Sequence, residues 1–564
     1  MVETIVPEVQ IASMGESALL ISFGSQISSR LNRLVHDLRQ RILTCAFRGI
    51  TEVVPGYTSL LICFDNRLAS HVELSEAIYQ LVKTVSTPDE SIGHTSRLHV
   101  IPVQYSGAAG PDLETVAQFH GLTQDEVVNA HTAREYTVAF LGFLPGFAYM
   151  AKVAPAIETS RLATPRTRVS AGSVGIAGAQ TGIYPFASPG GWQILGRTSV
   201  RTWDPYADQP ALFAPGDKVR FARSAYQPEE QVANEASPDT THPAFEVLSP
   251  GGMSMIQDQG RVGLGHFGVA RGGVFDRYAA TRANALVGNE PNAALLEMTW
   301  SGPTLAVLRN VTIALDGADL ECRVDGAPVP PRLSWFVRRG STLRFSGNHS
   351  ELGVRGYLAV AGGFDVPVVL GSRSTSLQAK FGGYAGRVLQ AGDTLGIGSD
   401  TVDPGLRAGK FWPGGTAGIP GHLVKLRYIP YSGRGQVLQQ AARQFAAQTW
   451  ELSRQADRMG FRFQPADGPT LPTHHGELAS FGVVRGAIQL PPDGNPLLLN
   501  VDHQTTGGYP LLGVVAEADW PLVAQLAPGA KVTFEQVSLK DALVASVSAR
   551  SDLAAGLRRL GRHG

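Results

Sequence analysis

The sequence predicts a mainly β protein with a smaller α+β part, and three observations support this fold class. Glycine supplies 64 of the 564 residues and proline 36, without a low-complexity period, which is typical of turn-rich β structure. Short strand-like stretches separated by glycine turns fill most of the chain. Two phrases also recur in similar form: QTGIYP (180–185) with QTTGGYP (504–510), and PGDKVRF (215–221) with PGAKVTF (528–534). Each of the first pair is preceded by a glycine-rich apolar run, AGSVGIAG (171–178) or RGAIQLPP (485–492). These repeats indicate two related β units, one in each half of the chain.

Residues 1–92 are predicted to form a small α+β lobe. SALLISF at 17–23 predicts a strand, and VVPGYTSLLICF at 53–64 predicts two strands that share a turn at Pro55-Gly56. Apolar residues at helical spacing predict one helix between these strands, capped by Ser28 or Ser29, and a second helix after them. The apolar faces of the two helices are Leu31, Leu34, Val35, Leu38 and Ile42, and then Leu74, Ile78, Leu81 and Val82.

The remaining chain divides at a polar stretch. Residues 93–225 predict a β barrel with a helix near 124–134. Residues 226–244 have neither helical nor strand period and cannot bury enough apolar surface to offset their ordering entropy, so we expect an exposed linker. Residues 245–422 predict a β domain with a helix at about 276–288, and residues 423–564 predict a last β domain with a helix near 434–452.

Bulk composition excludes several classes of function. Lys+Arg and Asp+Glu are 48 each, so no overall charge favours nucleic acid or an anionic membrane. No stretch of about 18 apolar residues predicts a membrane span, and the first residues lack a signal-peptide pattern. Three scattered cysteines and the absence of HxH or HxxxH predict no disulfide framework and no metal site; the pair His474-His475 falls in a polar loop. We therefore expect a soluble protein of the reducing cytoplasm.

Long motifs in each half resemble two companion families. REYTVAFLGFLPGFAYM and TPRTRVSAGSVGIAGAQTGIYPFASPGGWQILGRT resemble the B-type 5-oxoprolinase family, also called allophanate hydrolase subunit 1 or the Kip-type kinase inhibitor. The second half resembles the C-type 5-oxoprolinase family, or allophanate hydrolase subunit 2. It does so in SPGGMSMIQDQGRVGLGHFGV, FDRYAATRANALVGN, LEMTWSGPTL, RGYLAVAGGF, GSRST, DRMGFRF and DHQTTGGYP. The chain therefore looks like the B and C components of 5-oxoprolinase fused in that order, and both families are similar to the carboxyltransferase segment of urea carboxylase.

This resemblance implies a fold and a function. It implies cyclophilin-like β barrels in both halves, which contact each other and hold the site between them. It also implies ATP-dependent opening of the lactam 5-oxo-L-proline to L-glutamate, with ATP and its Mg²⁺, together with a separate partner protein, the A-type component of 5-oxoprolinase. The chain could in addition form homo-oligomers.

Two alternatives remain open. One is carboxyl transfer from carboxybiotin to urea or another amide, with biotin carried on another chain because no Met-Lys-Met attachment site occurs. The other is a Kip-type module that inhibits a histidine kinase. The chain also departs from the companion family at 270–277, where ARGGVFDR replaces the usual Pro-x-Ser-Gly-x-Met-Asp-Arg pattern, and at His503, where Arg or Ala is common. We therefore expect a different substrate shape at 270–277.

Neutral hydrogen-bonding groups beside glycine and proline suit a planar amide, a lactam or a ureido ring. Their alternative role is to form hydrogen bonds with buried backbone N–H and C=O groups at a barrel rim. An arginine can hold a carboxylate bidentately. The predicted substrate-binding residues are Arg166, Gln180, Thr181, Tyr184, Gln504, Thr505, Thr506 and Tyr509.

Charged residues in dense motifs are candidates for catalysis. Asp502, immediately before the second phrase, is the favoured acid or base there. Asp276 and Arg277 form the retained Asp-Arg pair, although Asp276 could simply cap a helix. His131 could act as a base or be a structural histidine. Other candidates in these motifs are Asp258, Arg261, Arg454, Asp457 and Arg458.

Glycine-rich stretches could present backbone N–H groups to a nucleotide phosphate. The candidates are Gly172, Ser173, Gly190 and Gly191. Tight barrel turns are the alternative explanation, and no GxxxxGK[ST] motif predicts a P-loop.

Overall fold

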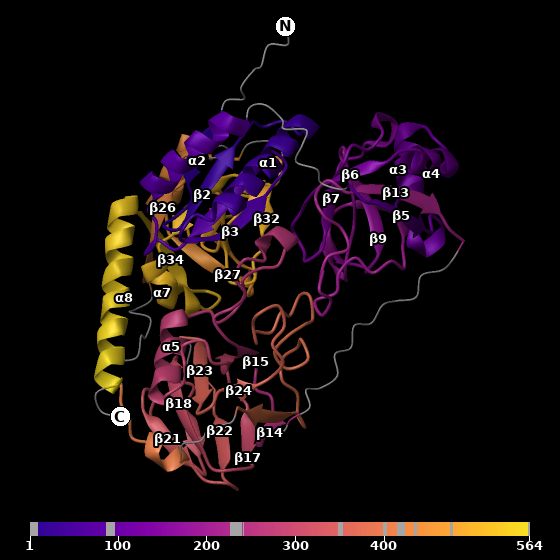
Figure 1. The fold of residues 1–564 in the computed structure, drawn as a ribbon. Coiled ribbons are helices and arrows are strands. Elements are labelled where there is room, and N and C mark those ends of the chain that lie inside the picture. The colour runs from indigo at the N-terminus through magenta and orange to yellow at the C-terminus, as the bar shows by residue number, and fades with distance from the viewer. Residues whose placement is uncertain are drawn as a thin grey trace.

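The computed structural model describes residues 9–85, 96–225, 240, 242–347, 353–398, 403–413, 423–433, 437–473 and 478–561. This part of the chain is mainly β with few helices, which confirms the predicted class (Figure 1). The predicted linker falls largely outside the described residues, and a strand already begins at Pro243, just before its predicted end. His474 and His475 also lie outside the described residues.

The N-terminal lobe is a four-stranded antiparallel sheet in the order β1-β2-β4-β3, with two helices on one face. Helix α1 follows Ser28 and buries Leu34, Val35, Leu38 and Ile42 against the sheet, as its apolar spacing predicts. The opposite face packs on the C-terminal barrel. The elements are β1 (Gln10–Ser13), β2 (Ala18–Ser22), α1 (Ser29–Cys45), β3 (Ile50–Pro55), β4 (Ser59–Phe64) and α2 (His71–Val85).

The next part is a seven-stranded barrel in the order β12-β9-β10-β7-β6-β13-β5. A single bridge between Gln104 and Arg197 joins its two edges. Helix α3 was not predicted; only eight residues long, it gives a weak periodic signal. The elements are β5 (Leu98–Val103), α3 (Leu113–His120), α4 (Gln124–Thr132), β6 (Tyr136–Leu141), β7 (Ala148–Ala151), β8 (Arg166–Val169), β9 (Ser173–Ala177), β10 (Gln180–Ile183), β11 (Ser188–Gly190), β12 (Gln193–Arg197) and β13 (Lys218–Arg223), with the 3-10 turns η1 (Gly107–Ala109) and η2 (Pro155–Ile157).

The middle domain packs a five-stranded sheet, β15-β16-β23-β18-β21, on a seven-stranded sheet, β20-β19-β22-β17-β14-β25-β24. Phe245 and Leu305 from one sheet share a core with Ile313 and Leu358 from the other. The elements are β14 (Pro243–Ser249), β15 (Met253–Gln257), η3 (Gly265–Phe267), α5 (Arg277–Leu286), β16 (Leu295–Thr299), β17 (Thr304–Val307), β18 (Val311–Gly317), β19 (Cys322–Val324), β20 (Ala327–Pro328), β21 (Ser334–Val337), β22 (Thr342–Phe345), β23 (Arg355–Val360), β24 (Phe364–Asp365), β25 (Thr394–Ile397) and η5 (Pro404–Arg407).

The last domain is a closed barrel in the order β26-β33-β30-β31-β28-β27-β34, followed by a long helix. The helix predicted near 434–452 is shorter, because Trp450 already starts a barrel strand. The elements are β26 (Leu423–Pro430), α6 (Gln439–Ala447), β27 (Trp450–Ala456), β28 (Gly460–Pro465), β29 (Phe481–Gly482), β30 (Ala487–Gln489), β31 (Leu497–Leu499), β32 (Thr506–Gly507), β33 (Leu511–Val515), η6 (Glu517–Asp519), α7 (Trp520–Ala524), β34 (Lys531–Gln536) and α8 (Leu539–Gly561).

The two barrels correspond strand by strand. The order β5-β13-β6-β7-β10-β9-β12 matches β26-β34-β27-β28-β31-β30-β33, and each barrel holds one parallel pair, β5 with β13 and β26 with β34. The glycine-rich runs form the equivalent strands β9 and β30, and the PGxKV phrases lead into β13 and β34. QTGIYP and QTTGGYP are not equivalent, however, because the first forms β10 and the second forms β32, the counterpart of β11. Interpreting those two phrases as matched sites is therefore wrong.

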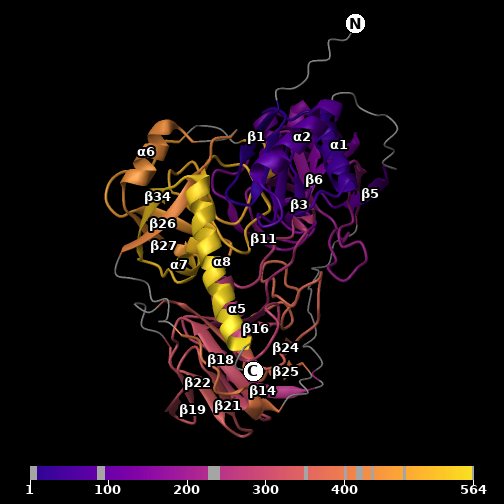
Figure 2. The same cartoon turned by 60° about the vertical axis from the view of Figure 1, so that its left-hand side comes forward.

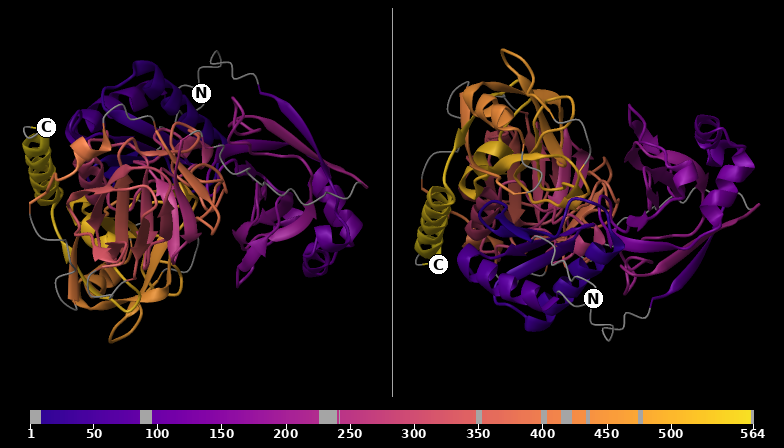
Figure 3. Two further views of the ribbon diagram at one scale, coloured as in Figure 1. Left: turned by 90° about the horizontal axis from the view of Figure 1, so that it is seen from below. Right: turned by 90° about the horizontal axis from the view of Figure 1, so that it is seen from above.

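The first barrel stands to one side of the other three parts in the views from below and above (Figure 3). It contacts the middle domain through Val269, Val369 and Phe381, which pack against the hydrophobic core of the first barrel. The N-terminal lobe, by contrast, lies directly on the second barrel (Figure 1). The two halves therefore contact each other at two places, the lobe on the second barrel and the first barrel on the middle domain.

Helix α8 runs along the second barrel and on to helix α5 of the middle domain (Figure 2). Its Leu553, Leu557 and Leu560 pack against the α5 core, and Gly556 lies against Trp412. This helix was not predicted, because its alanine- and serine-rich face buries few large residues.

Replacing Gly556 by alanine should loosen the C-terminal end of α8. A Cβ at this position would lie 2.1 Å from the Trp412 ring, and overpacking of that kind costs about 1–3 kcal/mol. The higher helix propensity of alanine returns only about 1 kcal/mol. We expect faster hydrogen exchange in residues 553–561, and unchanged exchange would show that the helix end is not held by this contact.

Candidate active site

A cavity of about 540 Å³ lies between the N-terminal lobe, residues 262–278 and the second barrel. Strands β3 and β4 supply one wall, the loop before α5 a second, and the start of β30 together with residues 501–505 a third. No described residue of the first barrel lines this cavity. The sequence predicted a site between the two barrels, but this cavity lies between the lobe and the second barrel.

Besides Arg67 and Arg550, which are held in ion pairs, three arginines from three different elements line the cavity. Arg271 comes from the loop before α5, Arg277 is the first residue of α5, and Arg485 precedes β30. Arg485 is held in place: its guanidinium stacks 3.5 Å above the Trp520 ring and donates to the Phe275 carbonyl at 2.7 Å. The sequence places these residues up to 214 positions apart, and only the fold brings them together.

None of these three arginines forms an ion pair within 4 Å in the described part of the chain, and two of them also bury a guanidinium N–H without a partner. Neither Arg277 nor Arg485 forms an ion pair within 4 Å there, and the Nε of each is buried without a hydrogen-bond partner. Burial lowers the pKa of Arg277 well below its usual range, and repulsion from Arg271 and Arg485 lowers it further. Burial likewise lowers the pKa of Arg485 to about 9. Arg277 keeps accessible surface although protein surrounds it, since it borders the cavity.

The acidic groups of the cavity are already engaged. Asp65 pairs with Arg67 at 2.5 Å, and Glu517 pairs with Arg550 of α8 at 3.4 Å. Glu52 accepts from the Gly263 backbone N–H at 2.8 Å, and burial raises its pKa. Burial also raises the pKa of Glu16, which accepts hydrogen bonds from the Ser546 hydroxyl and the Glu517 N–H.

Neutral groups complete the lining. The Thr505 hydroxyl and the Tyr278 hydroxyl are buried without partners among the described residues. His503 is buried, its Nδ1 lies 2.7 Å from the Gln504 carbonyl oxygen, and burial lowers its pKa to about 4, so it is neutral at pH 7. The cavity thus combines guanidinium donors with hydroxyl groups, which is the chemistry that binds a small carboxylate with a polar ring.

The predicted catalytic aspartates have structural partners. Asp276 caps α5, accepting from the N–H groups of Tyr278 at 2.9 Å and Ala279 at 3.0 Å. Asp502 pairs with Arg458 at 2.7 Å, and the same guanidinium also bonds Glu297 and the Gly273 carbonyl. Neither aspartate lines the cavity, so we give both a structural role in place of the predicted catalytic one.

The predicted nucleotide-binding residues form tight turns. The N–H of Gly172 donates to the Tyr184 carbonyl at 2.8 Å, and the N–H of Ser173 to Ser170 at 3.2 Å. Gly190 lies in β11 against the Tyr184 ring, and Gly191 follows it next to Pro165. The N–H groups of Gly172 and Ser173 are thus used inside the barrel and are not offered to a phosphate, whereas the assignment of Gly190 and Gly191 stays a prediction.

Arg166, predicted to bind substrate, fastens the two-stranded β8–β11 sheet to the barrel. Its guanidinium lies 2.5 Å from Asp112, whose other oxygen accepts from the Ile194 N–H at 2.6 Å. Tyr184 is buried among Phe147 and Trp192 on the same side of the barrel. Neither residue faces the cavity.

His131 lies in the core of the first barrel with no exposed surface. Its Nδ1 lies 2.8 Å from the Tyr105 hydroxyl and its Nε2 lies 3.0 Å from the Thr181 hydroxyl. Because Thr181 donates its own hydrogen to the Gly175 carbonyl, the His131 Nε2 must be the donor in that pair. His131 and Thr181 therefore have structural roles. Gln180, at the start of β10, is partly buried, with its Oε1 unpartnered among the described residues.

His131 should make the protein sensitive to acid. Burial lowers its pKa from 6.5 to about 3, so the unfolded chain takes up a proton between these values that the folded chain does not. Its contribution to stability is complete above pH 6.5 and is lost as pH falls towards 3. We expect His131→Gln to reduce the fall in urea midpoint between pH 7.5 and pH 5, though His266 and His503 leave a residual fall. An equal fall in urea midpoint in wild type and in His131→Gln would contradict this prediction.

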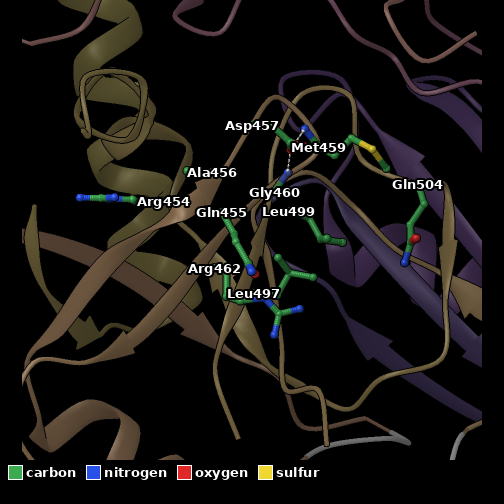
Figure 4. A pocket seen from close by; sticks show the side chains of 10 residues that line it. All are labelled: Arg454, Gln455, Ala456, Asp457, Met459, Gly460, Arg462, Leu497, Leu499 and Gln504. Carbon is green, nitrogen blue, oxygen red and sulfur yellow. Dashed lines mark hydrogen bonds between the residues drawn. The ribbon is translucent and has the colours of Figure 1, made fainter. Parts of the chain in front are cut away.

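Residues of the second phrase point to different places. Thr505 lines the arginine cavity, and the Thr506 hydroxyl accepts from the Phe143 N–H of the first barrel at 3.1 Å. Gln504 lines a separate groove of about 410 Å³ beside β27 and β28, together with Arg454 and Asp457 (Figure 4). Tyr509 follows β32 and is partly buried.

Most residues of the cavity were not predicted from the sequence, and they include Arg271, Arg485, Glu52 and Glu517. A signal existed for two of them, since Arg271 lies in the segment that departs from the companion family and Arg485 begins the repeated glycine-rich run.

Two other candidates, Asp258 and Arg261, hold the 372–374 loop through Ser372, Ser374 and the Ser374 carbonyl. Across the described ranges, no three His, Cys, Asp or Glu side chains lie where they could hold a metal ion.

Comparisons with known proteins define the class of this fold. A family model described as "Carboxyltransferase domain, subdomain C and D" matches residues 9–213, and one described as "Carboxyltransferase domain, subdomain A and B" matches residues 267–536. The chain belongs to this carboxyltransferase-domain family.

Within the family, the chain is similar to two separate proteins. It is 38% identical over 229 residues to the B subunit of 5-oxoprolinase from Bacillus subtilis, which covers 38% of this chain and 92% of that protein. It is 37% identical over 299 residues to the C subunit of 5-oxoprolinase from Haemophilus influenzae, which covers 53% of this chain and 93% of that protein. The crystal structure of TTHA0988 matches with a TM-score of 0.80 and 36% identity over 92% of this chain and 99% of that one. The chain thus unites B-like and C-like parts in one polypeptide, as its motifs predict.

Between residues 9 and 561, none of the described helices has the length and apolar character needed to cross a bilayer.

Proposed function

We propose that this chain is the B and C component of an ATP-dependent 5-oxoprolinase that opens 5-oxo-L-proline to L-glutamate with an A-type partner protein. The observation that carries the proposal is the cavity between a lobe from the B-like part and a barrel from the C-like part, with Arg277 and Arg485 unpaired among the described residues. Its position makes both parts necessary for one site. The names of the B-type and C-type relatives support the reaction.

The cavity residues suit each portion of this substrate. An arginine binds the carboxylate of 5-oxoproline, and the unpartnered hydroxyls of Thr505 and Tyr278 can bond the polar atoms of the lactam ring. The cationic wall also stabilises negative charge that develops on the amide oxygen when water attacks the ring. His503 is neutral and buried beside these groups, where its imidazole can form a hydrogen bond with the ligand.

ATP activates the amide, because a lactam is a poor target for water until its oxygen is phosphorylated. Two of the four predicted N–H donors, those of Gly172 and Ser173, are used inside the first barrel, so we assign ATP and its Mg²⁺ to the A-type partner. This chain then binds and orients the lactam and supplies the positive charge around it.

The test is glutamate release from 5-oxoproline and ATP, measured with purified chain, with purified A-type partner, and with both. We expect release only from the mixture, with one ADP formed for each glutamate. No release from the mixture, when both proteins are folded and associate, would overturn the proposal.

Carboxyl transfer to an amide is the second candidate. It is favoured by the family description and by the crystal structure of Kluyveromyces lactis urea carboxylase, which matches with a TM-score of 0.50 and 29% identity over 57% of this chain and 29% of that one. A carboxylated product from urea and free carboxybiotin would support it, whereas the 5-oxoprolinase reaction needs no biotin.

A further inference from the structure

The charges of the arginine cavity suggest a ligand with more than one negative group. Arg67 and Arg550 are neutralised by direct ion pairs with Asp65 and Glu517. Glu52 attracts Arg271, and Glu517 attracts both Arg277 and Arg485, but none of these three arginines has a described carboxylate within ion-pair distance. Arg271 is exposed and its Nε donates to the Gln259 carbonyl at 3.4 Å. Arg277 and Arg485 are the two whose Nε is buried without a partner among the described residues.

The two arginines are fixed at separate points. Arg277 is anchored by the backbone at the N-terminus of α5, where Asp276 is already used as the cap. Arg485 is held by its stacking on Trp520 and its bond to the Phe275 carbonyl. Each has a buried Nε without a partner among the described residues, and an unsatisfied charged donor is costly in a protein interior. Repulsion from Arg485 lowers the pKa of Arg277, so the two charges lie close enough to act on the same ligand, and a ligand with two negative groups can offer each arginine its own partner.

We propose that the cavity is built for a dicarboxylate, one carboxylate on Arg277 and one on Arg485, and therefore binds the ring-opened form better than the lactam. This inference rests on the proposed function and deepens it. 5-Oxoproline carries one carboxylate, and hydrolysis of its C–N bond gives an amine and a second carboxylate. The second arginine matches the group that the reaction creates, so its attraction grows as the ring opens.

The same arrangement predicts that the two arginines bind different groups of the ligand. One holds the permanent carboxylate in both substrate and product, whereas the other has an anionic partner only once the ring is open. A lactam with one carboxylate should thus depend on one arginine, and a dicarboxylate should depend on both.

Ligand affinity measured by calorimetry on the full-length chain alone, at constant ionic strength, tests this inference. The probes are glutarate as a dicarboxylate without an amine, pentanoate as the matched monocarboxylate, and 5-oxoproline. We expect glutarate to bind about tenfold or more tightly than pentanoate, as one additional charge-assisted hydrogen-bonded contact predicts. Arg277→Gln and Arg485→Gln should each remove this preference, whereas only one of them should weaken 5-oxoproline binding. The exposed Arg201, paired with Asp204 at 3.4 Å, provides the control variant Arg201→Gln.

Equal affinity for glutarate and pentanoate in wild type would overturn the inference, as would a preference for glutarate that survives both substitutions. If either variant fails to fold, as thermal unfolding would show, Arg277→Lys and Arg485→Lys keep the charge and should retain most of the preference. The chain alone is used for binding and the mixture with its partner for glutamate release, so either proposal can fail without the other.

Discussion

Replacement of Arg458 by methionine is expected to lower the free energy of unfolding by about 3–5 kcal/mol, the largest stability effect that the structure predicts. Its guanidinium is 4% exposed and joins Glu297 of β16 to Asp502, while its third branch donates to the Gly273 carbonyl at 2.6 Å. Without Arg458, two carboxylates that are largely excluded from water face each other uncompensated. The cost arises from these stranded charges more than from the lost bonds.

The measurements are the urea midpoint of the full chain and the rate of hydrogen exchange in β28 and β16. The midpoint should fall and exchange in both strands should become faster. A matched double variant, Arg458→Met with Glu297→Gln, removes one of the stranded charges and should recover part of the loss. If the single and double variants are equally destabilised, the loss comes from packing rather than from charge. Arg462→Met, on the exposed side of β28, is the control because Arg462 and its partner Asp493 are both accessible.

Replacement of Arg277 by glutamine is expected to lower kcat/KM for glutamate release by about 100-fold, the size expected when a buried charged group loses its hydrogen bonds to an anion. Glutamine can still donate one hydrogen bond but carries no charge. Because Arg277 begins α5 and makes no ion pair among the described residues, the substitution should leave the helix cap at Asp276 intact. The effect should therefore fall on activity rather than on folding.

Steady-state rates with saturating partner and ATP measure this change, and thermal unfolding confirms that the variant is folded. Arg201→Gln is again the control, because that side chain is about half exposed and remote from the cavity. Wild-type kcat/KM in Arg277→Gln would show that Arg277 contacts neither the lactam nor the carboxylate that forms when the ring opens.

The fold class followed from the sequence because strands and amphipathic helices leave local periodic signals. The apolar spacing of α1, the turn between β3 and β4 and the cap at Asp276 all depend on residues a few positions apart. The correspondence of the PGxKV strands also followed from local pattern. Helix α8 was missed because its buried positions are small, Ala542, Ser546 and Gly556, and small residues give no apolar stripe.

The site could be predicted less well, because the role of a polar residue depends on its partners in space. The interpretation of QTGIYP and QTTGGYP as matched sets failed because the same letters occupy different strands of the two barrels. Of the residues predicted to bind or react, Arg277 and Thr505 line the cavity, whereas His131 and Thr181 bond each other inside the first barrel.

By itself, the sequence determined a β-rich chain with B-like and C-like parts, its N-terminal helices and the absence of a P-loop, because these depend on residues that are neighbours along the chain. Only the tertiary structure decided which charges are neutralised within the described part of the chain. Arg458 forms an ion pair with Glu297, which is 161 positions away in the sequence. Arg277 and Arg485, by contrast, repel each other and form no ion pair within 4 Å among the described residues. Burial of an unpaired charge costs free energy, and this cost favours an anionic ligand in the cavity. The order of residues in the sequence does not reveal it.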